Sequence, residues 1–232
     1  MIINKCYQKQ TAFTLVEMAV VLVIFGLLIA GLLSPLGAQL ELRRTKETEA
    51  VLDEAKEALI GYALAHKFLP CPDVNAVPTG LEGARDASNQ CTALEGVLPW
   101  QLLGVRGQDA WGRYISYRVS TDFTNNSVFF GLSDTGDITV NSDIGTQTTN
   151  AIAVVVSHGA NGFGGINTTQ AAPDNQMLAP AGADELENTT LNRIFVSHTP
   201  TPQGSVNEFD DSVNWISANI LMNRMVAAGQ LP

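Results

Sequence analysis

Oxygen-bearing side chains gather in the last third of the sequence. Four glycines lie between positions 159 and 165, and glycine lets backbone carbonyl groups turn inward. Carboxylate, amide and carbonyl oxygens are the ligands that calcium takes in proteins. The alternative is that two of the acids cap a final helix and the others are solvated, since no EF-hand spacing links them. The candidate calcium ligands are Asn161, Asp184, Glu185, Asp210 and Asp211.

Residues that serve in catalysis show no comparable grouping. His66, His158 and His198 are scattered along the chain. Ser157 beside His158 is not a nucleophile arrangement, because adjacent strand residues point to opposite faces. No G-x-S-x-G, H-E-x-x-H or P-loop pattern occurs. We therefore expect structural histidines and a protein that is not an enzyme, with no cofactor other than the candidate calcium ion.

The composition limits the class of partner. The chain has 232 residues, with 13 basic and 23 acidic side chains and a net charge of −10. Binding to a nucleic acid backbone requires clustered Lys and Arg, so this balance does not favour nucleic acid. The length suffices for one domain of ordinary size together with an anchor and a stalk.

An apolar run extends from Phe13 to Leu33 and contains one charged residue, Glu17. A membrane-spanning helix needs about 20 apolar residues to cross a core of about 30 Å. A carboxylate near the centre of such a span costs about 2.5 to 3.5 kcal/mol, which makes Glu17 a functional candidate. An ordinary secretory signal does not fit, because the run is too long and no small-x-small cleavage site follows it. A plain single-pass anchor that contains a Glu remains the alternative.

The residues AFTLVE, from Ala12 to Glu17, follow a short leader with Lys5, Lys9 and no acid. They resemble the signature of type IV prepilins, including the pseudopilins of type II secretion. The resemblance implies cleavage by a prepilin peptidase between Ala12 and Phe13 and N-methylation of Phe13. It also implies that Glu17 acts in assembly by pairing with the amine of a neighbouring Phe13. The family usually has Gly where this chain has Ala12.

Removal of this leader changes the charge and the cysteine count. The remaining chain has 11 basic and 23 acidic residues, a net charge of −12, and it loses Cys6. In an exported chain, the two remaining cysteines, Cys71 and Cys91, are expected to form a disulfide. Closing a loop of this size stabilises the folded protein by about 3 kcal/mol. Two unrelated buried thiols are the alternative. Metal ligation is not favoured, because no C-x-x-C or nearby His pair is present.

Two further regions, the second of which consists of two segments, are similar to type II secretion major pseudopilins. DAWGRYISY, at 109–117, is similar to a D-x-W-G-x-x-x-x-Y pattern of these proteins. SHGANGFGG, at 157–165, and FDDSVNW, at 209–215, resemble the calcium-loop region of the same family. The family usually has an acid where Asn161 stands. In the family the second segment follows the first more closely, whereas here 43 residues separate 157–165 from 209–215.

Periodicity predicts the helices. Leu52, Ala55, Leu59 and Tyr62 are spaced for one face of a stalk helix over 34–68. Pro35 predicts a bend or local melting in the helix, and the prolines that flank Cys71 stop it. A final helix is expected from Asp211 or Ser212 to about Ala228, with Gly229 as its stop signal.

Alternating and apolar runs predict an antiparallel sheet. The run 151–156 is the most continuously apolar, so we expect it at the sheet centre against the stalk helix. The predicted strands are 114–121, 127–132, 138–140, 151–157 and 194–197.

Together these features predict an α+β, pilin-like fold, in which a long N-terminal helix packs on an antiparallel sheet head with a C-terminal helix. The predicted parts are a leader (1–12), a transmembrane and assembly helix (13–33), the stalk helix (34–68) and an exported globular head (69–232). We expect a structural subunit, a minor pilin or pseudopilin, of a type IV pilus or a type II secretion pseudopilus. A subunit of a type II secretion pseudopilus would take part in protein transport. The alternatives are a tip-located subunit that binds a ligand, a surface or DNA, and a membrane-tethered sensor or enzyme.

The expected partners are other pilin or pseudopilin subunits, prepilin peptidase, the inner-membrane assembly platform and, before assembly, membrane lipid. The expected location is the bacterial inner membrane, with the leader cytoplasmic and the head periplasmic, and afterwards the filament.

Overall fold

The computed structural model describes residues 14–169, 174–190 and 192–231, with residues 30–36 described by their backbone alone. The chain divides into two compact units, Met1–Arg43 and Arg44–Pro232, and the second is called the globular unit below. Among the residues that the structure describes, no helix combines the length and the apolar character that a membrane span requires. Phe13 and the side chains of residues 30–33, which belong to the predicted membrane segment, lie outside those residues.

Helix α1 (Leu15–His66) covers the predicted stalk helix as far as His66 and continues through Pro35. The backbone stays helical on both sides of Pro35, so the local melting expected there is not observed, although proline removes one helical hydrogen bond. In the globular unit, three of the four predicted face residues are buried: Leu52 is 2 % exposed, and Ala55 and Leu59 are fully buried. Tyr62, the fourth, is half-buried. The helix ends where Lys67 adopts a positive φ of 67° and donates its N–H to the Ala63 carbonyl, which is a left-handed C-terminal cap.

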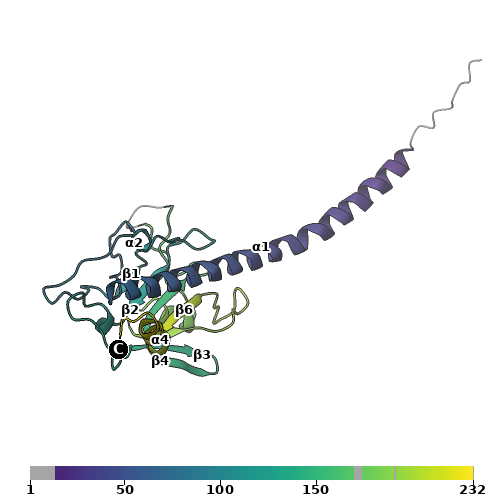
Figure 1. The fold of residues 1–232 in the computed structure, drawn as a ribbon. Helices are drawn as coiled ribbons and strands as arrows, with labels where there is room; N and C mark the ends of the chain where they lie inside the picture. The colour runs from purple at the N-terminus through teal and green to yellow at the C-terminus, as the bar shows by residue number, and fades with distance from the viewer. Residues whose placement is uncertain (1–13, 170–173, 191, 232) are drawn as a thin grey trace, which may run out of the picture. The chain divides into compact units, whose positions relative to one another are not determined.

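Within the described part of the chain, six strands form one mixed sheet. Figure 1 labels β1, β2, β3, β4 and β6. The central strand β4 pairs antiparallel with β2, β3 and β6, and β1 pairs antiparallel with β2. Strand β5 pairs parallel with β3, so the prediction of a purely antiparallel sheet was wrong at this one pairing. The strands are β1 (Glu95–Val97), β2 (Ser116–Val119), β3 (Ile138–Ser142), β4 (Gly145–Ser157), β5 (Ile194–Val196) and β6 (Ser212–Ser217).

Two other predicted elements differ from the structure. The run 127–132 is not a strand, because Asn125 turns the chain by accepting the backbone N–H groups of Ser127 and Val128. The last helix, α4 (Ala218–Ala227), begins later than predicted, because residues 212–217 extend along β4 as β6. Ser217 is its N-cap and accepts the Ile220 N–H, and Gly229 follows with the expected positive φ of 68°. The short helices are α2 (Trp100–Leu103), α3 (Ala183–Glu187) and the 3₁₀ helix η1 (Thr121–Phe123).

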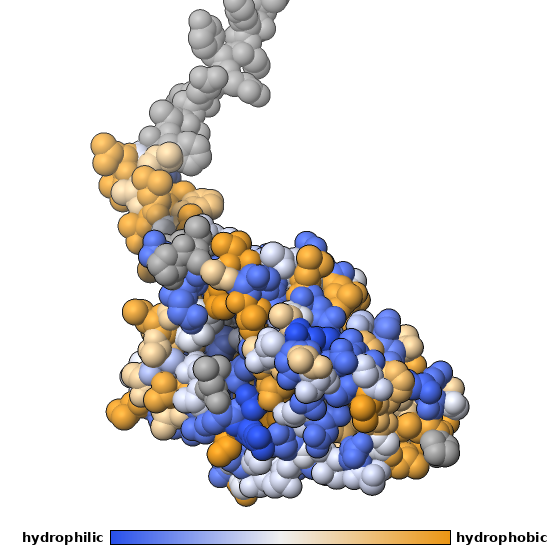
Figure 2. Space-filling view, turned by 90° about the vertical axis from the view of Figure 1, so that its left-hand side faces the viewer, coloured by the Kyte–Doolittle hydropathy of each residue, from blue (hydrophilic) through white to orange (hydrophobic). Residues whose placement is uncertain are grey.

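Each face of the sheet carries a buried cluster. On one face, Leu59 of α1 and Leu221 of α4 pack with Ile152 and Val155 of β4, as predicted for the run 151–156. On the other face, Val154 and Val156 pack with side chains from β3, β5 and β6. On the side that Figure 2 shows, hydrophilic and hydrophobic residues are interspersed over the surface of the globular unit. The buried part of β4, residues 151–157, ends directly before the loop that begins at His158, where several of the residues described below lie.

Candidate functional site

The N-terminus of α1 is closed by a reciprocal capping box. Thr14 donates its backbone N–H (2.8 Å) and its hydroxyl (2.9 Å) to Glu17 Oε2, and the Glu17 N–H donates to Thr14 Oγ1 at 3.2 Å. This is the S/T-x-x-E pattern, which satisfies N–H groups that have no partner within the helix. The Glu17 carboxylate therefore has a local partner in the single chain. The predicted processing residues, Ala12 and Phe13, lie outside the described residues.

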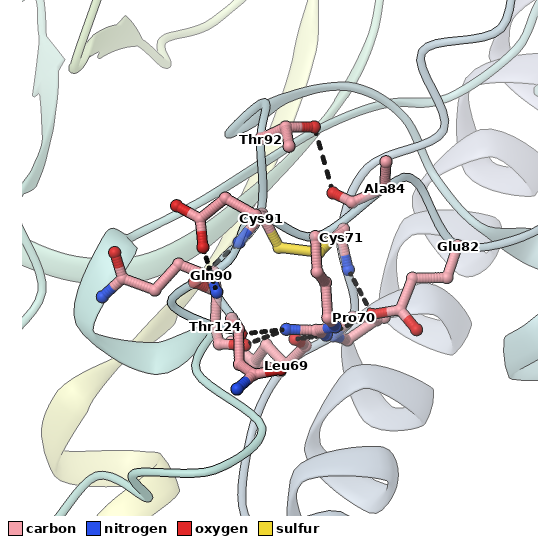
Figure 3. The surroundings of a disulfide bond; sticks show 12 residues. Leu69, Pro70, Cys71, Glu82, Ala84, Gln90, Cys91, Thr92 and Thr124 are labelled. Carbon is pink, nitrogen blue, oxygen red and sulfur yellow. Dashed lines mark hydrogen bonds and ion pairs between the residues drawn. A yellow bond between two sulfur atoms is a disulfide. The ribbon is translucent and has the colours of Figure 1, made fainter.

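Cys71 and Cys91 form the predicted disulfide, with their Cα atoms 5.3 Å apart (Figure 3). Polar contacts hold the loop on both sides of the bond. The Cys71 N–H donates to Glu82 Oε1 at 3.1 Å, and the Thr92 N–H and hydroxyl both donate to the Ala84 carbonyl at 3.0 Å. The disulfide thus closes a loop that is already ordered by its own hydrogen bonds.

Asp109 links the segment 109–117 to the segment 157–165. Its Oδ1 accepts the N–H groups of Trp111 and Arg113, both at 2.9 Å, and its Oδ2 accepts the Ser157 hydroxyl at 2.8 Å. Arg113 in turn donates to the carbonyls of Gly159 and Ala160. A buried carboxylate with three donors fixes this turn firmly, so the segment 109–117 positions the loop that follows β4.

Three carboxylates meet at the edge of β6. Glu185 comes from α3, and Asp210 and Asp211 directly precede β6; one oxygen from each lies within 4.8 Å of the others. Glu185 and Asp211 are buried, at 1 % and 5 % exposed. Gly159 makes the approach possible, because a Cβ atom there would lie 2.1 Å from Asp210 Oδ1. Asp210 and Asp211 lie before a strand, so the alternative that they cap the last helix is wrong.

The two other predicted ligands have different surroundings. Asn161 lies beside the cluster as a donor: its side-chain amide donates to Glu185 at 3.0 and 3.2 Å, and its N–H donates to Asp210 Oδ2 at 2.9 Å. Asp184 contacts His198 Nε2 at 3.3 Å and the Asn207 amide at 2.8 Å. Neighbouring helical residues point in different directions, which separates Asp184 from Glu185.

The carboxylate cluster fits a hard cation. Among the described residues, Asp210 Oδ1 and Asp211 Oδ1 are buried without a hydrogen-bond partner. Burial, and then the neighbouring acids, raise the pKa of Asp210 to about 6, although the Asn161 N–H opposes the shift. Burial, and then the charges of Glu185 and Asp210, hold the pKa of Asp211 well above its usual value, against the Asn188 hydrogen bond. Glu185, Asp210 and Asp211 could hold calcium, whose charge would compensate these three carboxylates.

The contact between Ser116 and His158 was not predicted from the sequence. His158 follows β4 and is 2 % exposed; its Nε2 lies 2.9 Å from Ser116 Oγ of β2, and its Nδ1 lies 3.7 Å from Asp211 Oδ1. Burial, and then the charge of Arg113, lower the pKa of His158 to about 4. The neutral ring therefore links the central strands to the carboxylate cluster. Only the pairing of β2 with β4 brings these residues together, so no sequence signal could have indicated the contact.

Comparison with known protein families gives one match. The family model of the prokaryotic N-terminal methylation motif matches residues 7–33. Neither the curated proteins nor the solved structures gave a match to the chain. The matched region contains the segment Ala12 to Glu17 on which the sequence resemblance depends. The chain thus carries the N-terminal signature of type IV prepilin-like proteins.

Proposed function

We propose that this chain is a structural subunit, a minor pilin or pseudopilin, of a type IV pilus or a type II secretion pseudopilus. The observation that carries the proposal is the methylation motif at residues 7–33, with Glu17 as the fifth residue after the cleavage position. Before assembly, the N-terminal helix resides in the bacterial inner membrane, with the leader cytoplasmic and the globular unit periplasmic. The disulfide supports this location of the globular unit, because such bonds persist in oxidising compartments.

The exposed apolar side chains of α1 support assembly through this helix. Leu15 is 87 % exposed, Leu22 68 % and Leu27 70 %. A continuous apolar surface of this kind needs lipid or protein to cover it. In the proposed filament, the helices of neighbouring copies replace lipid as the cover.

Glu17 changes partner in this proposal. In the single chain its carboxylate accepts two hydrogen bonds from Thr14. In the filament it pairs with the methylated amine of a neighbouring Phe13, so that donor and acceptor are both charged. Assembly therefore replaces a contact between the carboxylate and uncharged donors with an ion pair between copies.

The test compares Glu17→Ala with Thr14→Ala in the full chain, in cells that assemble the filament. If Glu17 acts between copies, Glu17→Ala leaves the membrane-bound level unchanged and abolishes incorporation into sheared filaments, whereas Thr14→Ala removes only the cap and still assembles. Equal loss in both variants would assign Glu17 to helix capping. Normal assembly of Glu17→Ala would refute the pairing.

Processing has a separate test. Mass spectrometry of the mature chain should show an N-terminus at methylated Phe13. A mature protein that begins at Met1 would contradict the proposal.

A further inference from the structure

A lysine, an asparagine and an aspartate meet where α1 and β6 contact each other. Lys56 Nζ donates to the side-chain oxygen of Asn214, Oδ1, at 3.1 Å. The side-chain nitrogen of Asn214, Nδ2, donates to Asp53 Oδ1 at 2.7 Å. Lys56 and Asn214 are half-buried, Asp53 is exposed, and all three belong to the globular unit. An amine, a carboxamide and a carboxylate are therefore in direct contact, although the lysine and the asparagine are 158 positions apart.

Two regular elements position these groups. Asp53 and Lys56 are three positions apart on α1, so they lie on one face of the helix. Asn214 lies on β6, opposite Val155 of the central strand β4. Its Oδ1 also accepts the backbone N–H of Trp215 at 2.9 Å. Three contacts therefore orient the Asn214 carboxamide, two at its oxygen and one at its nitrogen.

The contacts suit the exchange of one amide for another. The carboxamide carbon, Cγ, is bonded to the oxygen that Lys56 Nζ contacts, so rotation within the flexible lysine side chain can bring the amine to this carbon. Well-oriented reacting groups behave as if at about 10⁵ to 10⁸ M, which offsets the low reactivity of a carboxamide. The Trp215 N–H stabilises negative charge that develops on the oxygen during attack. Asp53 contacts the nitrogen that leaves, where a carboxylate can transfer a proton.

The amine of Lys56 has no carboxylate partner. Among the described residues, it donates to the neutral oxygen of Asn214 and forms no ion pair. An amine attacks only after its ammonium form has lost a proton, and an ion pair would favour the ammonium form. The surroundings of Lys56 therefore leave its amine available for reaction.

We propose that Lys56 and Asn214 form an isopeptide bond within the chain. Lys56 Nζ, as the neutral amine, bonds to Asn214 Cγ, and the bond between Cγ and Nδ2 breaks. Asp53 takes one proton from Nζ and delivers it to Nδ2, which leaves as ammonia. The reaction has no net oxidation or reduction and needs no second reactant, so the folded chain carries it out once on itself.

The bond joins α1 covalently to the sheet. It closes a loop of 158 positions, whereas the disulfide joins cysteines that are 20 positions apart. A longer loop removes more conformational entropy from the unfolded chain. The bond also prevents α1 from separating from β6 when the globular unit is pulled. The proposal does not depend on the filament function, since all of its groups lie within one chain.

The first test is peptide mapping of the folded full chain by trypsin and mass spectrometry. Trypsin does not cleave after an acylated lysine, so the cross-linked chain should give a branched peptide in which residues 47–67 are joined to residues 194–224. Its mass should be lower than the sum of the two peptides by one ammonia. Lys56→Arg keeps the charge and a donor but cannot form the bond, so this variant should lack the branched peptide. Recovery of the linear peptides alone from the wild-type chain would overturn the proposal.

The intact mass separates the bond from another loss of ammonia. An asparagine followed by glycine, such as Asn161 before Gly162, can release ammonia by closing a succinimide without a lysine. The wild-type chain should therefore be lighter by one ammonia than its processed sequence requires, whereas Lys56→Arg should have its full mass. An equal deficit in both chains would overturn the proposal.

The rate of cross-linking tests the part assigned to Asp53. The rate is measured as the branched fraction at successive times after a pulse of labelled synthesis. Asp53→Ala should lower it about a hundredfold or more, because a positioned acid–base group contributes at least that factor. The matched control is Glu54→Ala, at a neighbouring acid of α1 that contacts Arg106 and should not affect the rate. Equal rates in Asp53→Ala and wild type would overturn the proton transfer by Asp53.

Thermal unfolding gives a readout that does not depend on peptides. Lys56→Arg should unfold about 10 to 20 °C below the wild-type chain, because it loses the restriction of a loop of 158 positions. A difference below about 2 °C would overturn the proposal. Absence of the wild-type chain from filaments would refute the proposed function and leave each of these outcomes unchanged.

Discussion

Removal of the disulfide by Cys71→Ala with Cys91→Ala should lower the free energy of unfolding by about 3 kcal/mol. The bond joins residues 20 positions apart, and closing a loop of that size removes about this much conformational entropy from the unfolded chain. The hydrogen bonds of Glu82, Ala84 and Thr92 around the bond do not involve the sulfur atoms. The native loop should therefore persist in the variant, so the effect acts mainly through the unfolded state.

Thermal unfolding of the mature chain in detergent measures this effect. A domain of this size loses about 2 to 4 °C in Tm per kcal/mol, so the midpoint should fall by about 6 to 12 °C. Reduction of the wild-type chain should reproduce the shift, and the same reductant should not affect the double alanine variant. A loss below about 1 kcal/mol would refute the loop-entropy reasoning. Loss of cooperative unfolding in the variant would show instead that the bond is needed to form the native loop.

Three further outcomes follow from the same structure. Calcium should raise the Tm above that measured with chelator, and at a hundredfold excess over its Kd it should add about 2.7 kcal/mol to the free energy of unfolding. Asp210→Asn should reduce this stabilisation. No shift of the Tm at millimolar calcium would exclude the site. Leu59→Ala, at a fully buried position of α1, should lower the free energy of unfolding in denaturant by about 2 to 5 kcal/mol. Leu81→Ala, at a position that is 54 % exposed, should lower it by less than about 0.5 kcal/mol. Similar losses in the two variants would contradict the assignment of the core. Burial raises the pKa of Asp73, but hydrogen bonds from Asn75, Gly80 and Thr79 outweigh it and hold that pKa below its ordinary value. The stabilisation by Asp73 should therefore be complete above about pH 4, the pKa of an unfolded Asp, and disappear as the pH falls through the folded-state value. Unfolding curves of wild type and Asp73→Asn should converge in acid, and a constant difference would contradict this sign.

Local patterns in the sequence determined several features correctly. The buried face of α1 followed from the spacing of Leu52, Ala55 and Leu59, because helical periodicity is a property of neighbouring residues. The methylation motif lies in one continuous segment, residues 7–33, which a family model can match. The pairing of Cys71 with Cys91 followed from the loss of Cys6 with the leader, since only two thiols then remained.

Features that depend on pairing between distant strands were predicted less well. Residues 212–217 can form a helix or a strand, and their pairing with β4 decided for the strand. Strand β5 runs parallel to β3 because of the path of the chain between them, which has no local signal. The predicted strand 127–132 had suitable residues, but its chain turns at Asn125.

The candidate cation site shows the same division. The sequence supplied five residues with suitable oxygens, whereas the tertiary structure brought together Glu185, Asp210 and Asp211 and placed Asp184 beside His198. Residue type fixes which atoms a side chain can offer, so the sequence alone indicated calcium chemistry. The direction in which each carboxylate points depends on α3, on the approach that Gly159 permits and on the start of β6. These are contacts between segments that are distant in sequence, and only folding sets them.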